Sequence, residues 1–157
     1  MNRTFADMLN SRLAELTSGL LFDYQPDNST GSRPITITES MLADPSRDEP
    51  EGSEFPFVRW AIYRGSFDYR RPAPFKVVVD GAIWTAGNIT DGTRDIQTLT
   101  VALGKITEKR GFPPYRLKTP IDFVTGNPAR GHEGIQPHPW YYTRLYLEFL
   151  VPWHREE

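Results

Sequence analysis

The feature that most constrains the fold is the run of residues 142–153, which is the longest strand-like segment in the chain. Aromatic and aliphatic side chains, which suit a pleated and half-buried surface, dominate it. A loop rich in proline and aromatic residues, 131–142, leads directly into it. We therefore expect a strand at 142–152 that lies inside the main sheet, with the other elements packed around it.

Composition sets the class of protein. The chain has 157 residues, which predicts one domain, 1–157, with a sizeable core. Its 13% aromatic share favours β or α+β structure. The absence of cysteine excludes disulfides and thiolate metal sites. A net charge of −2 lacks the basic field of a nonspecific nucleic-acid binder. No apolar run suits a signal peptide or a membrane span, so we expect a soluble protein of a cytoplasm-like compartment, without membrane partners.

Two segments have the apolar spacing of amphipathic helices. The first is expected at 5–18, with Thr4 as its N-cap and Gly19 closing it. The second is expected at 93–110, capped by Asp91 or Thr93. Its stripe consists of Ile96, Leu99, Leu103 and Ile106. Gly104 interrupts this helix at a cost of about 1 kcal/mol relative to alanine, which indicates close approach to a neighbour.

The remaining strands are expected near 56–64, 75–86 and 115–125, after a long loop at 23–54 that contains one short strand-like piece at 35–38. In the first of them, Val58, Trp60 and Ile62 form the expected core face. Asp80-Gly81 is either a hairpin turn or a bulge within one long strand, and we favour the bulge. Pro120 indicates an edge position or a bulge. The predicted fold is α+β: a two-layer domain with about four strands, mostly antiparallel, and two amphipathic helices on one face.

Residues that could carry metal or catalytic chemistry are few. His132, Glu133 and His138 lie in one loop, but their spacing matches no H-E-x-x-H pattern. The acidic run 44–54 does not have the spacing of an EF-hand loop, and we expect a solvated loop. The chain has no G-x-S-x-G and no phosphate-binding glycine motif. We expect no cofactor, no metal and no enzymatic activity; a small metal-dependent hydrolase using the loop carboxylates and His132 or His138 is a remote alternative.

Basic and aromatic side chains alternate between residues 59 and 71, which is the composition of a surface that stacks on nucleic acid. The ordinary alternative is an amphipathic strand with a solvated edge, and we favour it. The residues that we expect to be exposed, or to face DNA, are Arg64, Arg70 and Arg71.

Four short motifs resemble, in their order, those of tail terminator and tail-completion (neck) proteins of long-tailed bacteriophages. The first, Glu54-Phe-Pro-Phe-Val, opens the first core strand, and Gly92-Thr-Arg-Asp-Ile-Gln-Thr-Leu resembles a G-x-R-D-(aliphatic)-x-x-L run at the second helix. Tyr115-Arg-Leu-Lys-Thr-Pro-Ile resembles a Y-R-L-x-x-P-(aliphatic) strand. Gln136-Pro-His-Pro-Trp-Tyr-Tyr resembles a Q-P-Y-P-Y-aromatic segment before the last strand. The resemblance covers residues 54–153, and the chain departs from it in its acidic loop, in the 126–134 insertion and at His138.

This resemblance implies a structural protein of the virion, at the tail–head junction, that assembles in the host cytoplasm. Its partners would be itself, in a ring that is expected to be a hexamer, the major tail tube protein and the head-completion or connector protein. Genomic DNA would pass through the ring with at most nonspecific contacts. The alternative within the same virion is a head-completion or adaptor protein on the portal side. Cyclic rings need heterologous contacts, for which aromatic side chains are suited, while local packing of the same side chains is the equally weighted alternative. The expected contact residues are Pro137, Pro139, Trp140, Tyr141 and Tyr142.

Overall fold

The computed structural model describes residues 4–24, 31–39, 55–108, 114–127 and 132–152. In chain order its elements are α1 (Phe5–Thr17), β1 (Leu21–Tyr24), β2 (Gly31–Pro34), β3 (Thr36–Glu39), β4 (Phe57–Gly65), β5 (Ala73–Trp84), α2 (Ile89–Gly104), the 3-10 turn η2 (Lys105–Thr107), β6 (Arg116–Leu117), β7 (Asp122–Asn127), β8 (His132–Glu133) and β9 (Trp140–Val151).

The fold is α+β, as expected, but its sheet is larger than predicted and is mixed. Over the described residues the main sheet has seven strands, in the order β3-β4-β5-β9-β7-β8, with β6 also paired to β9. β3 runs parallel to β4 and the other pairs are antiparallel. The prediction of about four strands was wrong because the main sheet also includes the short strands β3 and β8, and because the segment expected as one strand at 115–125 forms two, β6 and β7. The strands β1 and β2 make a separate two-stranded sheet.

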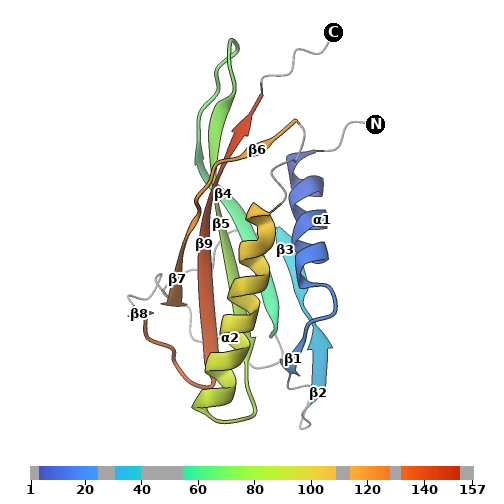
Figure 1. Cartoon of the computed structure of the whole chain (residues 1–157), viewed down its shortest axis with the longest axis vertical. Helices are drawn as coiled ribbons and strands as arrows, with labels where there is room; N and C mark the ends of the chain where they lie inside the picture. Colours follow the sequence, from blue (N-terminus) through green and yellow to red (C-terminus); the bar gives the residue numbers. More distant parts are fainter. Residues whose placement is uncertain (1–3, 25–30, 40–54, 109–113, 128–131, 153–157) are drawn as a thin grey trace.

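The last strand occupies the position expected of it. β9 pairs with β5 over twelve successive positions, from Trp84↔Trp140 to Ala73↔Val151. On its other side it pairs with β6 and β7 (Figure 1). Its side chains alternate between buried and half-buried along the strand, because one face meets the helices and the other does not. β9 is therefore an interior strand of the sheet.

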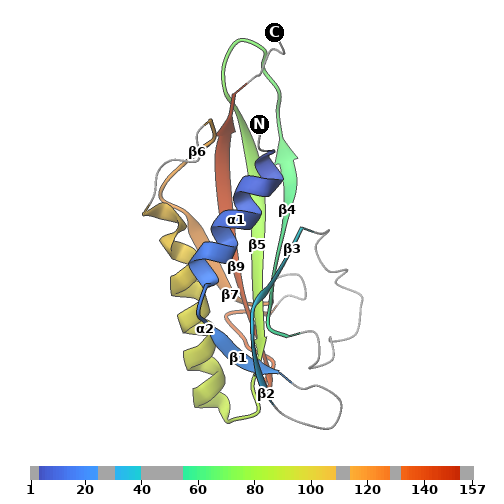
Figure 2. The same ribbon diagram turned by 90° about the vertical axis from the view of Figure 1, so that its right-hand side faces the viewer.

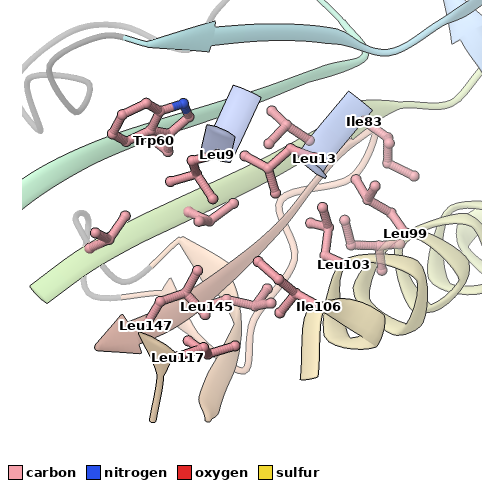
Figure 3. Close-up of a cluster of buried hydrophobic side chains, with 14 of the residues drawn as sticks. Leu9, Leu13, Trp60, Ile83, Leu99, Leu103, Ile106, Leu117, Leu145 and Leu147 are labelled. Carbon is pink, nitrogen blue, oxygen red and sulfur yellow. The ribbon is translucent and has the colours of Figure 1, made fainter. Parts of the chain in front are cut away.

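Both helices lie on the same face of this sheet (Figures 1 and 2). They share one core with the sheet side chains that point towards the helices, and Figure 3 shows the centre of this core. Its best-buried helix residues are Leu9, Leu13, Leu99, Leu103 and Ile106. From the sheet come Val58, Trp60, Val77, Val79, Ile83, Tyr141, Leu145, Leu147 and Phe149.

Helix α1 forms where it was predicted. Thr4 is its N-cap and accepts a hydrogen bond from the Asp7 backbone N–H at 3.1 Å. Gly19 follows its end with φ +82°, a left-handed conformation that glycine adopts without a Cβ clash. Asn10, near the middle of the helix, accepts a 2.7 Å hydrogen bond from Trp60 Nε1. This bond joins the helix to β4.

Helix α2 begins four residues earlier than predicted. Its N-cap is Asn88, not Asp91 or Thr93. The Asn88 side chain accepts from the Asp91 backbone N–H, and the Asp91 carboxylate accepts from the Asn88 backbone N–H, both at 3.0 Å. This capping box holds the helix start. Its α-helical part ends at Gly104, before η2, and the predicted end at residue 110 lies outside the described residues.

The strand predictions need three corrections. Asp80-Gly81 is neither a turn nor a bulge, because β5 continues through it in regular register with both neighbours. The bulge lies instead in β4, between Ile62 and Arg64, and Ile62 is exposed rather than part of the core face. The expected strand 115–125 is divided at Pro120 into β6 and β7.

On the face away from the helices, a paired charge crosses from β5 to β9. Asp80 and Arg144 are register partners. Arg144 Nε and Nη2 donate to the two Asp80 carboxylate oxygens at 2.6 and 2.9 Å. The two side chains are only 13% and 23% exposed. Burial disfavours the charge of Arg144, but the hydrogen bond and charge of Asp80 outweigh it, so the Arg144 pKa is raised.

Candidate interaction surfaces

The proline-rich loop before β9 is held by side-chain and backbone hydrogen bonds. The Gln136 amide forms two bonds with the Tyr142 backbone: its Nε2 donates to the carbonyl at 2.9 Å, and its Oε1 accepts from the N–H at 2.8 Å. The Pro139 carbonyl accepts from the Thr85 N–H at 3.0 Å. The loop is thereby attached both to its own strand and to the end of β5.

Tyr141, one of the expected contact residues, is a core residue. It is 1% exposed, and its ring lies against Gly92 in the first turn of α2. Its hydroxyl forms a 2.7 Å hydrogen bond with His138 Nδ1. Burial raises the pKa of the Tyr141 hydroxyl. Local packing thus accounts for Tyr141.

Trp140 and Tyr142 point to the opposite face of the sheet. They pack with Trp84 around a small second core made by Phe55, Phe57 and Ala82. The rings of Phe55 and Tyr142 meet edge to face with centroids 6.2 Å apart. Both residues are half-buried, as are Pro137 and Pro139. The most exposed side chains of this loop are His138 and Ile135, neither of which is among the expected contact residues.

The predicted basic residues lie on a projecting hairpin. Beyond the bulge in β4, residues 62–72 extend past the helices at one end of the molecule, and we call them the arm (Figures 1 and 2). Arg64, Arg70 and Arg71 are all exposed on the arm, as expected. Arg59, which the sequence grouped with them, lies back on the sheet with its guanidinium carbon 4.1 Å from the centre of the Phe57 ring.

The tip of the arm is ordered by Asp68. Its carboxylate accepts from the Arg70 backbone N–H at 2.9 Å and from Arg71 Nε at 3.0 Å. The backbone bond and the Arg71 guanidinium lower the pKa of Asp68. Arg70 Nε donates to the Tyr69 hydroxyl at 2.7 Å. Arg64 pairs with no described carboxylate.

The arm also exposes apolar surface. Phe67 is 82% exposed, and its ring forms a T-shaped pair with that of Phe75, with centroids 5.8 Å apart. Tyr69, Tyr63 and Ile62 are exposed beside it. Large apolar side chains gathered at one place on a surface mark interaction sites more often than scattered ones do.

An acidic surface lies at the other end of the molecule, where β1 and the start of α2 meet (Figure 1). We call it the acidic end and define it by Asp23, Asp91 and Asp95 with the exposed Leu21 and Ile89. The pKa of Asp95 is raised by burial and by the nearby charges of Asp23 and Asp91. Sequence reasoning missed this surface because its residues come from segments more than 60 positions apart.

A shallow apolar groove of about 610 Å³ runs between α2 and the β6–β7 edge. Val101 and Phe123 expose much of their side chains along it. Gly104 also lies here, and a Cβ at this position would meet no atom within 4 Å. The predicted close approach at Gly104 is therefore wrong.

Residues considered for catalysis stay apart or lie beyond what is described. His138 is exposed and its ring contacts Tyr141; the side chains of His132 and Glu133 and the acidic run 44–54 lie outside the description. Over the described parts of the chain, no three histidine, cysteine or acidic residues are grouped to hold a metal ion. None of the helices described is long and apolar enough to cross a membrane.

Compared with known proteins, the chain matches no family profile and no curated sequence.

Proposed function

We propose that this chain is a structural protein of a tailed-phage virion, a ring-forming tail terminator or completion protein that caps the tail tube and joins it to the head–neck connector. The proposal starts from the resemblance of four motifs. Its partners are further copies of the chain, the tube protein and the connector, and its working site is the virion.

The observation that supports it best is the convergence of three of these motifs in space. Gly92 of the second motif lies against Tyr141 of the fourth. Phe55 of the first motif packs against Tyr142 of the fourth. The third motif pairs at the other end of β9, where Leu117 is the register partner of Phe149. Segments that share an order in sequence and also pack together are more informative than isolated short matches, because they describe one structural unit.

The surface is consistent with an assembling protein. Exposed aromatic and arginine side chains, the residue types most common in interface hot spots, are concentrated on the arm. A subunit of a cyclic ring uses two different surfaces, and the arm and the acidic end are chemically different.

The test is to mix the purified chain with tubes of the tail protein encoded nearest to it and to examine the tube ends by electron microscopy. We expect one ring of density at a tube end, and mass photometry of the free chain should show a defined oligomer. A chain that remains a monomer and leaves the tubes unchanged would refute the proposal. Capture by the portal or connector protein alone, without tube binding, would support the head-completion alternative.

Trp140→Ala tests the loop before β9. Because Trp140 is half-buried and packs against the second core, the variant is first checked for folding by circular dichroism. Loss of tube capping by a folded variant would assign the loop to a contact with a partner. Normal capping would leave it a purely local packing element.

A further inference from the structure

We infer that copies of this chain associate head to tail, with the arm of one copy docked on the acidic end of the next. The inference rests on the proposed function only in taking the chain to assemble with itself, and it names the two surfaces that make the contact.

The first support is charge complementarity. Arg64, Arg70 and Arg71 face a single carboxylate, Asp68, so the arm carries a net charge of +2. At the acidic end, Asp23, Asp91 and Asp95 accompany one arginine, Arg94, which leaves a net charge of −2. Opposite charge patches steer association and fix its orientation.

The second support is that carboxylates of the acidic end lack compensation within the copy. Asp23 and Asp91 accept only hydrogen bonds from neutral groups, namely Ala86 N–H and Thr85 for Asp23 and Asn88 N–H for Asp91. Among the described residues, Asp95 has neither a hydrogen-bond donor nor a cation paired with it. An arginine from another copy would offset the mutual repulsion of these three carboxylates.

The third support is apolar matching. Leu21 and Ile89 are 62% and 66% exposed, and Leu21 is on the same side of β1 as Asp23 because alternate residues of a strand share a face. Phe67 of the arm is 82% exposed. Each surface thus combines charge with exposed apolar side chains, which is the composition of a contact that excludes water.

The geometry decides between contact within a copy and contact between copies. The arm and the acidic end lie at opposite ends of the longest axis of the molecule (Figures 1 and 2). They cannot meet in one chain. A contact between two unlike surfaces is heterologous, and it generates a closed ring when the rotation between copies returns to its start.

The test uses two variants that are defective in different halves of the contact. Arg64→Glu with Arg70→Glu reverses the arm. Asp95→Arg with Thr98→Arg reverses the acidic end, since positions three apart share one side of α2. In sedimentation velocity, each variant alone should self-associate at least about tenfold more weakly than wild type. An equimolar mixture should recover assembly, because the reversed arm fits the reversed end and the two native surfaces fit each other.

Lys105→Glu with Arg116→Glu is the matched control for the arm variant, since it changes the net charge by the same amount at exposed positions outside both surfaces. It should assemble as wild type does. Phe67→Ser should weaken assembly without lowering the melting temperature, because Phe67 is almost fully exposed in one copy. Assembly of the wild type should also weaken as salt is raised, because exposed charges are screened.

Several outcomes would overturn the inference. If both reversed variants assemble normally, the contact between copies lies elsewhere, and this result does not refute the proposed capping of the tail tube. If each is a folded monomer but the mixture does not assemble, the two surfaces do not meet. If the wild type remains monomeric and the arm variant instead loses binding to labelled duplex DNA, the arm is a nucleic-acid surface. If the mixture of the two reversed variants assembles but the chain does not cap tail tubes, the proposed function is refuted and the head-to-tail contact is supported.

Discussion

The ring of Tyr141 lies in the space that a Cβ at residue 92 would need. Gly92 is in the first turn of α2 and Tyr141 is the second residue of β9, so this contact sets the separation of the helix from the central strand. A second glycine, Gly81 of β5, serves the same layer, since a Cβ there would come within 2.9 Å of Leu99. Helix α2 is therefore seated on the sheet at two positions without side chains.

Gly92→Ala is expected to lower the free energy of unfolding by about 1–3 kcal/mol, the usual cost of overpacking a well-packed site. The loss should occur although alanine is the better helix former. Chemical denaturation measures it. Gly104→Ala is the control in the same helix, and it should raise stability by up to about 1 kcal/mol because its Cβ would meet nothing. Equal effects of the two substitutions would contradict the role of the Tyr141 ring.

Asp80→Ala should destabilise the protein by about 1–3 kcal/mol, because it leaves the largely buried Arg144 guanidinium without its carboxylate. Replacing both residues by apolar ones, Asp80→Val with Arg144→Leu, should recover part of this loss. Urea unfolding of these two variants measures the loss and its recovery. Arg71→Ala removes the exposed ion pair with Asp68 and should leave the urea midpoint nearly unchanged, because solvent screens exposed ion pairs.

The pKa of Asp95 should lie above that of an ordinary aspartate, and the pKa of Asp68 should lie below it. The pKa of Asp95 is raised, so its ionisation costs the fold stability as the pH rises from the unfolded-state value, near 3.8, through the raised folded value. Asp95→Asn should therefore stabilise the protein at pH 7, by at most about 0.5 kcal/mol after solvent screening, and this gain should vanish at pH 3. NMR titration of the side-chain carboxyl carbons measures both groups directly. A pKa for Asp68 above that of Asp95 would contradict the arrangement.

Gln136→Glu should reduce stability by about 1–2 kcal/mol, since a carboxylate cannot donate to the Tyr142 carbonyl that the amide now satisfies. Differential scanning calorimetry is a suitable measurement. Gln97→Glu, at an exposed position on α2, introduces the same charge and should leave the melting temperature nearly unchanged. A similar shift in both variants would mean that net charge, not the hydrogen bonds, is responsible.

The sequence predicted best where a periodic apolar pattern was long. The stripe from Ile96 to Ile106 and the run that became β9 were both identified correctly, because each has one face in the main core. The cap of α2 was misplaced because Asn88, Asp91 and Thr93 are all favourable N-cap types, and only the reciprocal hydrogen bonds between Asn88 and Asp91 distinguish them.

The sequence failed where the reason for a residue lies in a distant segment. Gly81 was read as local chain geometry, whereas α2 packing over β5 requires it. The short strands β1 and β2 were not predicted, because they are stabilised by pairing with each other, which local propensity does not reveal. Among the expected contact residues, Tyr141 is buried. The sequence left partner contact and local packing equally weighted, because an aromatic side chain after a proline-rich loop has the same local sequence whether it points inward or outward.

The central place of β9 has a consequence for how this protein acquires its structure during synthesis. Every main-sheet strand that pairs with β9 leaves the ribosome before it does. The β4–β5 hairpin can form early from neighbouring segments, but β5 then keeps an open edge until a strand about 60 residues later arrives to pair with it. Non-local pairing of this kind slows folding. We therefore expect nascent chains that stop before β9 to be prone to aggregation and to be bound by chaperones.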